Sequence, residues 1–299
     1  MTKTSSAIKE HYGFELPCSA IVKITHEKAS QAKVFNSEVS TDKKLEPLLV
    51  VELDGSMVPI VEYSEATEEQ KQKGLRHNRD CHWREFRLCT VSCPDEANTY
   101  YGVVQGTPFQ AGCMMYDSCL KKGMNDTTHI HGVADGAPWI ADQFEDQFGA
   151  NHEFLIDFYH VSEYLGAASK ELDPDILNDQ SREQWLSEAK AKLKQGKARE
   201  ILTDLARHVT ETPTETCPLQ TAHQYLSKRQ DYLNYAHALE QGLPIGSGEV
   251  ESGHRSVLQA RLKKPGAWWK LENAENMAHL KVMQANDHWD QFWQQAAAA

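Results

Sequence analysis

Three acidic positions lie where the sequence pattern changes, and together they could hold metal ions. Asp54 closes the apolar run "LEPLLVVELDG", and Asp135 closes the β-like run "THIHGVADG". A third acid lies in "GSGEVESG", after a long stretch of helix-forming residues. Two aspartates and one glutamate form an oxygen-only ligand set, which suits Mg²⁺ or Mn²⁺. Two such ions, about 3.5 to 4 Å apart, could activate a hydroxyl and stabilise a leaving oxygen in phosphoryl transfer.

Asp135 also has a simpler interpretation. It precedes "PWIADQFEDQF", which is typical of a helix, and an aspartate can accept hydrogen bonds from the free amides of a first helical turn. For Asp135 alone, helix capping is the favoured interpretation. The further acids at strand and helix ends favour the metal interpretation instead, because a metal site needs several carboxylates.

Two glutamates compete for the third position. If Ser247 is the N-cap of the last helical segment, Glu249 falls in the first turn. The helix dipole favours an acid there without any catalytic role. Glu251 lies two residues further along, before the small residues Ser252 and Gly253. The residue pattern alone leaves both glutamates open.

Cysteine and histidine side chains offer a different metal chemistry. The seven cysteines are an odd number and include no Cys-x-x-Cys pair, which argues against a disulfide framework and against a zinc ribbon. "REFRLCTVSC" is typical of a strand, in which small buried cysteines are ordinary. We therefore favour reduced thiols over a zinc site. The zinc alternative would draw on Cys81, Cys89, Cys93, His82, His129 and His131.

The composition limits the class of protein. Hydrophobic residues make up 40% and charged residues 25% of the 299 residues, as in a folded globular protein. The sequence has no run of about 18 apolar residues that could span a membrane. Its start, "MTKTSSAIKEHYGFELPCSA", has no apolar signal-peptide core. We expect a cytoplasmic protein without a membrane partner.

The charge distribution is uneven. A net charge of −12 argues against a protein that coats nucleic acid, because that function needs clustered Lys and Arg. The acids are concentrated elsewhere, however, and "RLKKPGAWWK" forms a local basic segment with Arg261, Lys263 and Lys264. Trp268 and Trp269 in the same segment could stack on unpaired bases or could fill the core.

The order of elements predicts an α/β fold. We expect a buried strand at 45–55 with "SMVPIVEY" as its antiparallel partner, then further strands at 83–93 and 99–106. A helix at 108–123 precedes the strand ending at Asp135, and another helix precedes "EFLIDFYHV", which we expect to be a strand. Alternation of strands and helices is the mark of an α/β sheet. Beyond this point only helix-forming patterns follow.

Four blocks, in order, resemble one known family. They are "VELDGSMV", "HGVADGAPWI", "DFYHVSEYL" and "IGSGEVESGHRSVLQARLKKPGAWW", and they span residues 51–269. The sequence resembles the DDE transposases of bacterial insertion sequences, within them the Kra-type group, which is related to the Mutator-like transposases. Each block alone is weak, but the ordered set is specific.

The resemblance implies a fold, a site and partners. The fold would be ribonuclease H-like, a mixed sheet with a helical insertion before the last catalytic acid. Asp54, Asp135 and Glu251 would be the catalytic acids and the ligands of two Mg²⁺ or Mn²⁺ ions, with Glu249 as the competitor of Glu251. Asp157 and His160 would support the site. DNA, as transposon ends and target, would be the substrate, held in part by Arg261, Lys263 and Lys264.

The same resemblance suggests how the chain is divided. We expect a short N-terminal segment at 1–45, a first part of the catalytic core at 46–165, a helical insertion at 166–240 and a C-terminal part at 241–299. Transposases of this group resemble longer proteins with an N-terminal region that recognises the element's ends. Here about 45 residues precede the first expected strand, so we expect 1–45 to be a remnant of that region.

The implied activity is metal-dependent DNA cleavage and strand transfer, performed by a homodimer or higher oligomer on DNA and therefore associated with the nucleoid. Two alternatives remain. The same acids would serve a ribonuclease H-like nuclease without strand transfer. A truncated or repurposed element would only bind DNA.

Overall fold

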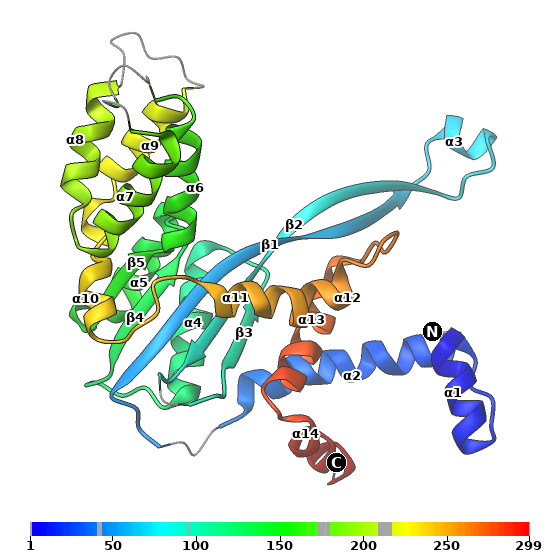
Figure 1. The fold of residues 1–299 in the computed structure, drawn as a ribbon. Coiled ribbons are helices and arrows are strands. Elements are labelled where there is room, and N and C mark those ends of the chain that lie inside the picture. The colour runs from blue at the N-terminus through cyan, green and yellow to red at the C-terminus, as the bar shows by residue number, and fades with distance from the viewer. Residues whose placement is uncertain are drawn as a thin grey trace.

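A computed structural model describes residues 2–40, 44–94, 96–172, 177, 180–208 and 217–298. Its centre is a five-stranded sheet in the order β3-β2-β1-β4-β5 (Figure 1). β2 runs antiparallel to both β1 and β3, whereas β4 and β5 run parallel to β1. This order and these directions are those of a ribonuclease H-like fold, as predicted. The strands are β1 (Leu48–Glu65), β2 (His77–Ser92), β3 (Tyr100–Val104), β4 (His129–Ala134) and β5 (His152–Ile156).

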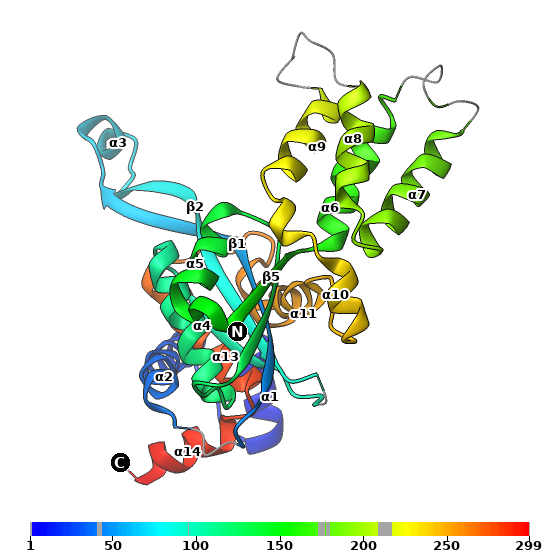
Figure 2. The same ribbon diagram turned by 90° about the vertical axis from the view of Figure 1, so that its left-hand side faces the viewer.

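Helices cover both faces of the sheet, and the alternation of side chains along β1 decides which residue faces which layer. Leu53 faces α4 (Pro108–Lys122) and α5 (Pro138–Phe148). Glu52 and Asp54 face the opposite layer, where the chain from 248 to 285 crosses the sheet (Figure 2). That layer consists of α11 (Gly248–Gly253), a π-helical turn η3 (His254–Gln259), α12 (Ala260–Leu262) and α13 (Leu271–Ala285).

β1 is one long strand, so the prediction that "SMVPIVEY" folds back on the preceding run is wrong. The antiparallel partner is β2, paired from Val50 opposite Ser92 to Glu65 opposite His77. Gly55 does not make a turn; the position that a Cβ would occupy there is filled by the Glu85 side chain. Beyond the sheet the two strands continue as a ribbon with α3 (Glu68–Gln72) at its tip (Figure 1).

A group of helices follows β5 and stands at the β5 end of the sheet (Figure 1). The expected strand "EFLIDFYHV" ends earlier than predicted, since Asp157 caps a helix that begins at Phe158. No strand occurs among the residues described between 166 and 240. The elements are α6 (Phe158–Ser169), α7 (Arg182–Lys194), α8 (Ala198–His208), α9 (Pro218–Ser227), the 3-10 turn η2 (Gln230–Tyr232) and α10 (Tyr235–Glu240).

The N-terminal helices pack on the C-terminal ones. α1 (Thr2–Tyr12) leads into α2 (Cys18–Glu38), which lies against α13. Phe35 of α2 contacts Phe292 of α14 (Trp289–Ala298) edge to face. Lys33 forms an ion pair with Glu275, 2.8 Å apart. Segment 1–45 is therefore attached to the core through α13. None of the helices in the described part of the chain is long and apolar enough to cross a membrane.

Candidate active site

Asp54 and Asp135 come from neighbouring strands. In the parallel pairing of β1 with β4, Glu52 lies opposite Val133. Asp54 and Asp135 each lie two residues beyond this last pair, so the two aspartates follow the same end of neighbouring strands. Glu52 and Asp54 share the face of β1 that α11 crosses, because alternate residues of a strand point to the same face.

Each carboxylate oxygen of Asp54 has a polar neighbour. Its Oδ1 accepts a hydrogen bond from the Gly55 amide at 2.7 Å. Its Oδ2 lies 3.3 Å from Nε2 of His254, at the start of the π-helical turn. The Asp54 side chain is 36% exposed, so solvent and ions reach it.

The backbone around Asp135 is fixed by the helical insertion. Asp135 Oδ1 accepts from the Ala137 amide at 2.9 Å, so part of the capping interpretation holds although Asp135 is not the N-cap of α5. From α9, the Tyr225 hydroxyl donates to the Asp135 carbonyl at 2.6 Å. Arg229, just after α9, donates to the carbonyl of Gly136 at 2.9 Å. Gly136 itself has a positive φ of 79°, which a side chain would strain.

The two candidate glutamates point in different directions. The Glu251 side chain is 61% exposed, lies 3.7 Å from Arg255, and precedes His254 by one helical turn. It therefore extends into solvent beside the exposed Arg255. Glu249 instead accepts a hydrogen bond from Thr99 at 3.1 Å and lines a separate polar pocket of about 380 Å³.

Ser247 occupies the N-cap position of α11, as expected, but its side chain makes no capping bond. Its hydroxyl donates to Asp157 Oδ2 at 2.6 Å, and its amide donates to the same oxygen at 2.5 Å. Asp157 Oδ1 accepts from the amides of Tyr159 and His160. The buried Asp157 carboxylate thus joins the start of α6 to the start of α11.

The contacts of His160 are with aromatic residues and Glu163, rather than with Asp54, Asp135 or Glu251. Its ring lies against Tyr164 and Tyr225, with centroids 5.3 and 5.9 Å away, and its Nδ1 is 3.9 Å from Glu163. His160 therefore supports the aromatic packing around Tyr225, which in turn holds the Asp135 backbone.

Sequence analysis missed Glu52, which lies on the same face as Asp54. Glu52 is buried, and its Oε2 accepts from the Val250 amide of α11 at 2.8 Å. Burial, opposed by this hydrogen bond and supported by the charges of Glu249 and Asp157, raises the pKa of Glu52 to about 8. An acid two residues before Asp54 in a run otherwise read as buried strand was the available signal.

His254 is a second residue near Asp54 that was not predicted from the sequence. Its residue is 3% exposed, and its two ring nitrogens make no aligned hydrogen bond among the described residues. Its position on the helix that carries Glu251, three residues further along, was the signal in the sequence.

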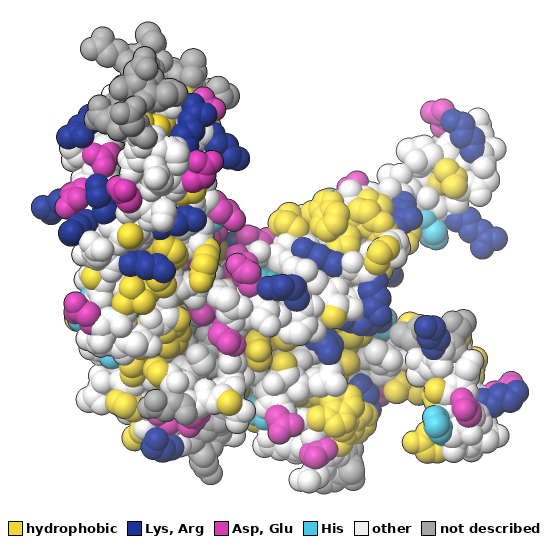
Figure 3. Space-filling view, viewed as in Figure 1, with side chains coloured by type: hydrophobic (Ala, Val, Ile, Leu, Met, Phe, Trp, Pro, Cys, Tyr) yellow, Lys and Arg dark blue, Asp and Glu magenta, His cyan; other side chains and the backbone are white. Residues whose placement is uncertain are grey.

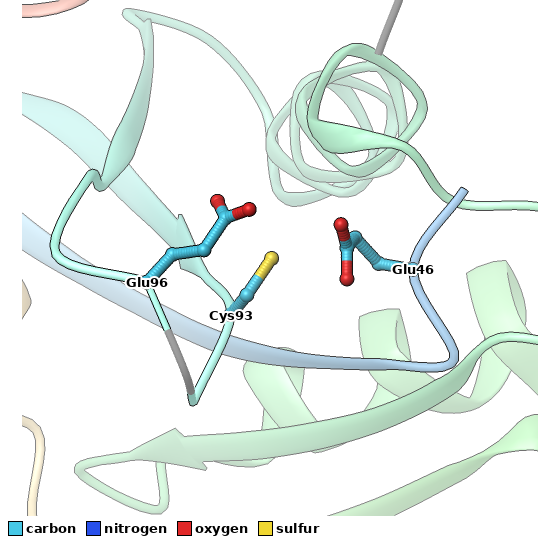
Figure 4. Close-up of side chains that lie close together, drawn as sticks. All are labelled: Glu46, Cys93 and Glu96. Atoms are coloured by element: carbon cyan, nitrogen blue, oxygen red, sulfur yellow. The ribbon is translucent and has the colours of Figure 1, made fainter. Parts of the chain in front are cut away.

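The donor set fits hard divalent ions, because Asp54, Asp135 and Glu251 offer only carboxylate oxygens. These three do not converge within 4.8 Å. In the described part of the chain, one group of three or more candidate ligands has its ligand atoms within 4.8 Å of one another: Glu46, Cys93 and Glu96 (Figure 4). Ligands shared between two ions about 4 Å apart need not meet so tightly.

The Glu46 group already contains a cation. Lys122 donates to Glu96 and to the Asn98 carbonyl, both at 2.8 Å. Burial, supported by the two glutamates, raises the pKa of the Cys93 thiol to about 11, which keeps it protonated and a poor ligand. The cysteine and histidine set considered for zinc is not brought together as a group among the described residues.

The basic segment with Arg261, Lys263 and Lys264 comes directly after α11 and η3 in the chain. Arg261 stacks over the ring of Trp269, 4.7 Å from its centroid, whereas Lys264 is exposed and Lys263 half-buried. Trp269 is buried and donates to the Leu262 carbonyl, so it fills the core rather than stacking on bases. Trp268 is half-buried between Trp83 and Arg79. Figure 3 shows Lys and Arg side chains gathered over α12.

The chain is similar in part to known proteins. No family model matches the chain. The chain is 24% identical over 172 residues to a UPF0236 protein in the vanSb 3′ region of Streptococcus gallolyticus, which is 57% of this chain and 36% of that protein. It thus spans about a third of that relative's length. It also aligns with a chain of the Drosophila P element transposase strand transfer complex, at 8% identity and a TM-score of 0.25, over 97% of this chain and 85% of that chain.

Proposed function

We propose that the protein is a DDE-type transposase that cleaves DNA and transfers the cut strand, using Asp54, Asp135 and Glu251 as metal ligands. The main support is the parallel pairing of β1 with β4, since Asp54 and Asp135 each follow the last paired residues by two positions. The ordered motif resemblance is a second support. When bound, Mg²⁺ or Mn²⁺ would activate a water or 3′-hydroxyl and stabilise the leaving oxygen.

The protein's own residues would then orient the reacting groups. Glu52 and Asp157 would fix the start of α11, so that Glu251 meets the two aspartates. Tyr225 and Arg229 would hold the Asp135 loop from the insertion. Lys263 and Lys264 would hold DNA phosphates next to the site. Arg261, which stacks on Trp269, would add its charge to theirs. Assembly of two or more copies on DNA is part of the same proposal.

The test uses the purified protein, Mn²⁺, duplexes made from the DNA that flanks the coding sequence, and a supercoiled target plasmid. A transposase joins duplex to plasmid. Hydrolysis without joining supports the nuclease alternative, and DNA binding without either product supports the repurposed alternative. Asp54→Asn and Asp135→Asn should each reduce joining by more than about 100-fold, the upper end of the loss on removing a supporting residue of a metal site.

A further inference from the structure

The side chain of His254 has no role in the proposed function, yet it is buried in the layer above the aspartates. Its side chain is 4% exposed, and neither ring nitrogen has an aligned hydrogen-bond partner among the described residues. Buried polar groups without a partner are rare and call for an explanation. Its Nε2 lies 3.3 Å from Asp54 Oδ2.

The helix around His254 is irregular at this point. Residues 254–259 form a π-helical turn between α11 and α12. Such turns carry one extra residue and occur frequently at functional sites. Gly253, just before it, lies so close to Leu88 and Tyr101 that a Cβ would meet both side chains. The close packing and the π-helical turn together bring the imidazole down to Asp54.

We infer that His254 is a positioning residue that orients the Asp54 carboxylate for metal binding, and this inference rests on the proposed function. The Gly55 amide holds Oδ1, and Nε2 of His254 lies 3.3 Å from Oδ2 without an aligned hydrogen bond, so a small rotation of the ring would let its N–H donate to Oδ2. With both bonds made, one lone pair of each oxygen would be engaged and the carboxylate plane fixed, while the other lone pairs face the ions. Metal-binding carboxylates are commonly held by such hydrogen bonds, whose loss costs about 10 to 100-fold in affinity.

The experiment measures Mn²⁺ affinity by calorimetry without DNA, so it does not depend on catalysis. His254→Gln keeps an N–H at about the same reach, whereas His254→Met has a similar length and no donor. We expect Mn²⁺ affinity within about 3-fold of the wild type for the Gln variant and about 10 to 100-fold weaker for the Met variant. Val257→Ala, a buried change in the same turn, is the control and should leave the affinity unchanged.

Two outcomes would overturn the inference: wild-type affinity in the Met variant, or equal weakening in both His254 variants. Circular dichroism of each variant confirms that it is folded. Asp54→Asn tests the proposed function separately. If that variant keeps wild-type affinity, the metal site itself is wrong, whereas loss of affinity there with no effect of His254→Met rejects only the role of His254.

Discussion

At the scale of single residues, the contacts of each carboxylate distinguish a proposed metal ligand from a neighbouring acid. Glu249 and Glu251 are two residues apart on α11, yet Glu249 accepts a hydrogen bond from Thr99 and Glu251 lies beside the exposed Arg255. We expect Glu251→Gln to reduce DNA joining by more than about 100-fold, because it removes a metal ligand. Glu249→Gln is the matched control and should keep activity within about 3-fold. Equal losses in a strand-joining assay would contradict this assignment.

Asp157 was expected to support the site, and its contacts are those of a structural residue. Its carboxylate accepts from three amides and one hydroxyl while buried. Asp157→Ala leaves these donors without a partner, so we expect the free energy of unfolding to fall by about 3 kcal/mol. Ser247→Ala removes a single hydroxyl and should cost about 1 kcal/mol. Urea denaturation of both variants measures this; equal effects would show that the Asp157 contacts carry no extra stability.

At the scale of elements, the insertion is connected to the site through α9. Tyr225 stacks on Tyr164 with ring centroids 4.1 Å apart and donates to the Asp135 carbonyl. Tyr225→Phe keeps the ring and removes the donor. We expect about 1 kcal/mol lower stability and a several-fold weaker Mn²⁺ affinity, because the Asp135 loop loses one of its anchors. Tyr232→Phe, in the same insertion, is the control. Unchanged Mn²⁺ affinity in the Tyr225 variant would separate the insertion from the metal site.

Some helices and strands could be predicted from the sequence and others could not. The buried apolar run before Asp54 and the Pro-started helix after Asp135 predicted the strands and helices that carry both aspartates, because local periodicity sets them. The long β1 was missed, since Asp54-Gly55 resembles a turn and only pairing with β2 over the whole length shows otherwise. Glu52 and His254 were missed because their contacts join segments far apart in the chain.

At the scale of the whole molecule, the proposed function requires a protein of net charge −12 to bind DNA. We expect Arg261→Ala combined with Lys263→Ala and Lys264→Ala to weaken DNA binding and to lower the slope of log affinity against log salt by about 2 to 3. Arg261 contributes less, because it stacks on Trp269. A salt titration by fluorescence anisotropy measures the slope. Lys192→Ala, whose charge is paired with Glu200 and Asp204, is the control, and an unchanged slope in the triple variant would refute the assignment.

The contact between α2 and α13 makes stability depend on pH. Burial, helped by Lys33 and Lys121, lowers the pKa of His279 to about 4. Between pH 6.5 and 4 the unfolded chain therefore binds a proton that the folded protein does not, so stability falls as the pH falls. Because the ring is half-buried, we expect a loss of about 2 kcal/mol. Denaturation at pH 7 and pH 4.5 should show this loss in the wild type, and His279→Gln should lose about 2 kcal/mol less.

The hydrogen bond from Val250 to Glu52 joins positions 198 residues apart in the chain. A ribosome adds about 5 to 20 residues per second, so roughly 10 to 40 s separate the emergence of the first acid from that of the helix that completes the set. During that interval the nascent polypeptide contains Asp54, and later Asp135, but not yet Glu251. Under the proposed function, it would therefore be inactive on nearby DNA until synthesis is almost finished, and chains that end before α11 would lack the third ligand.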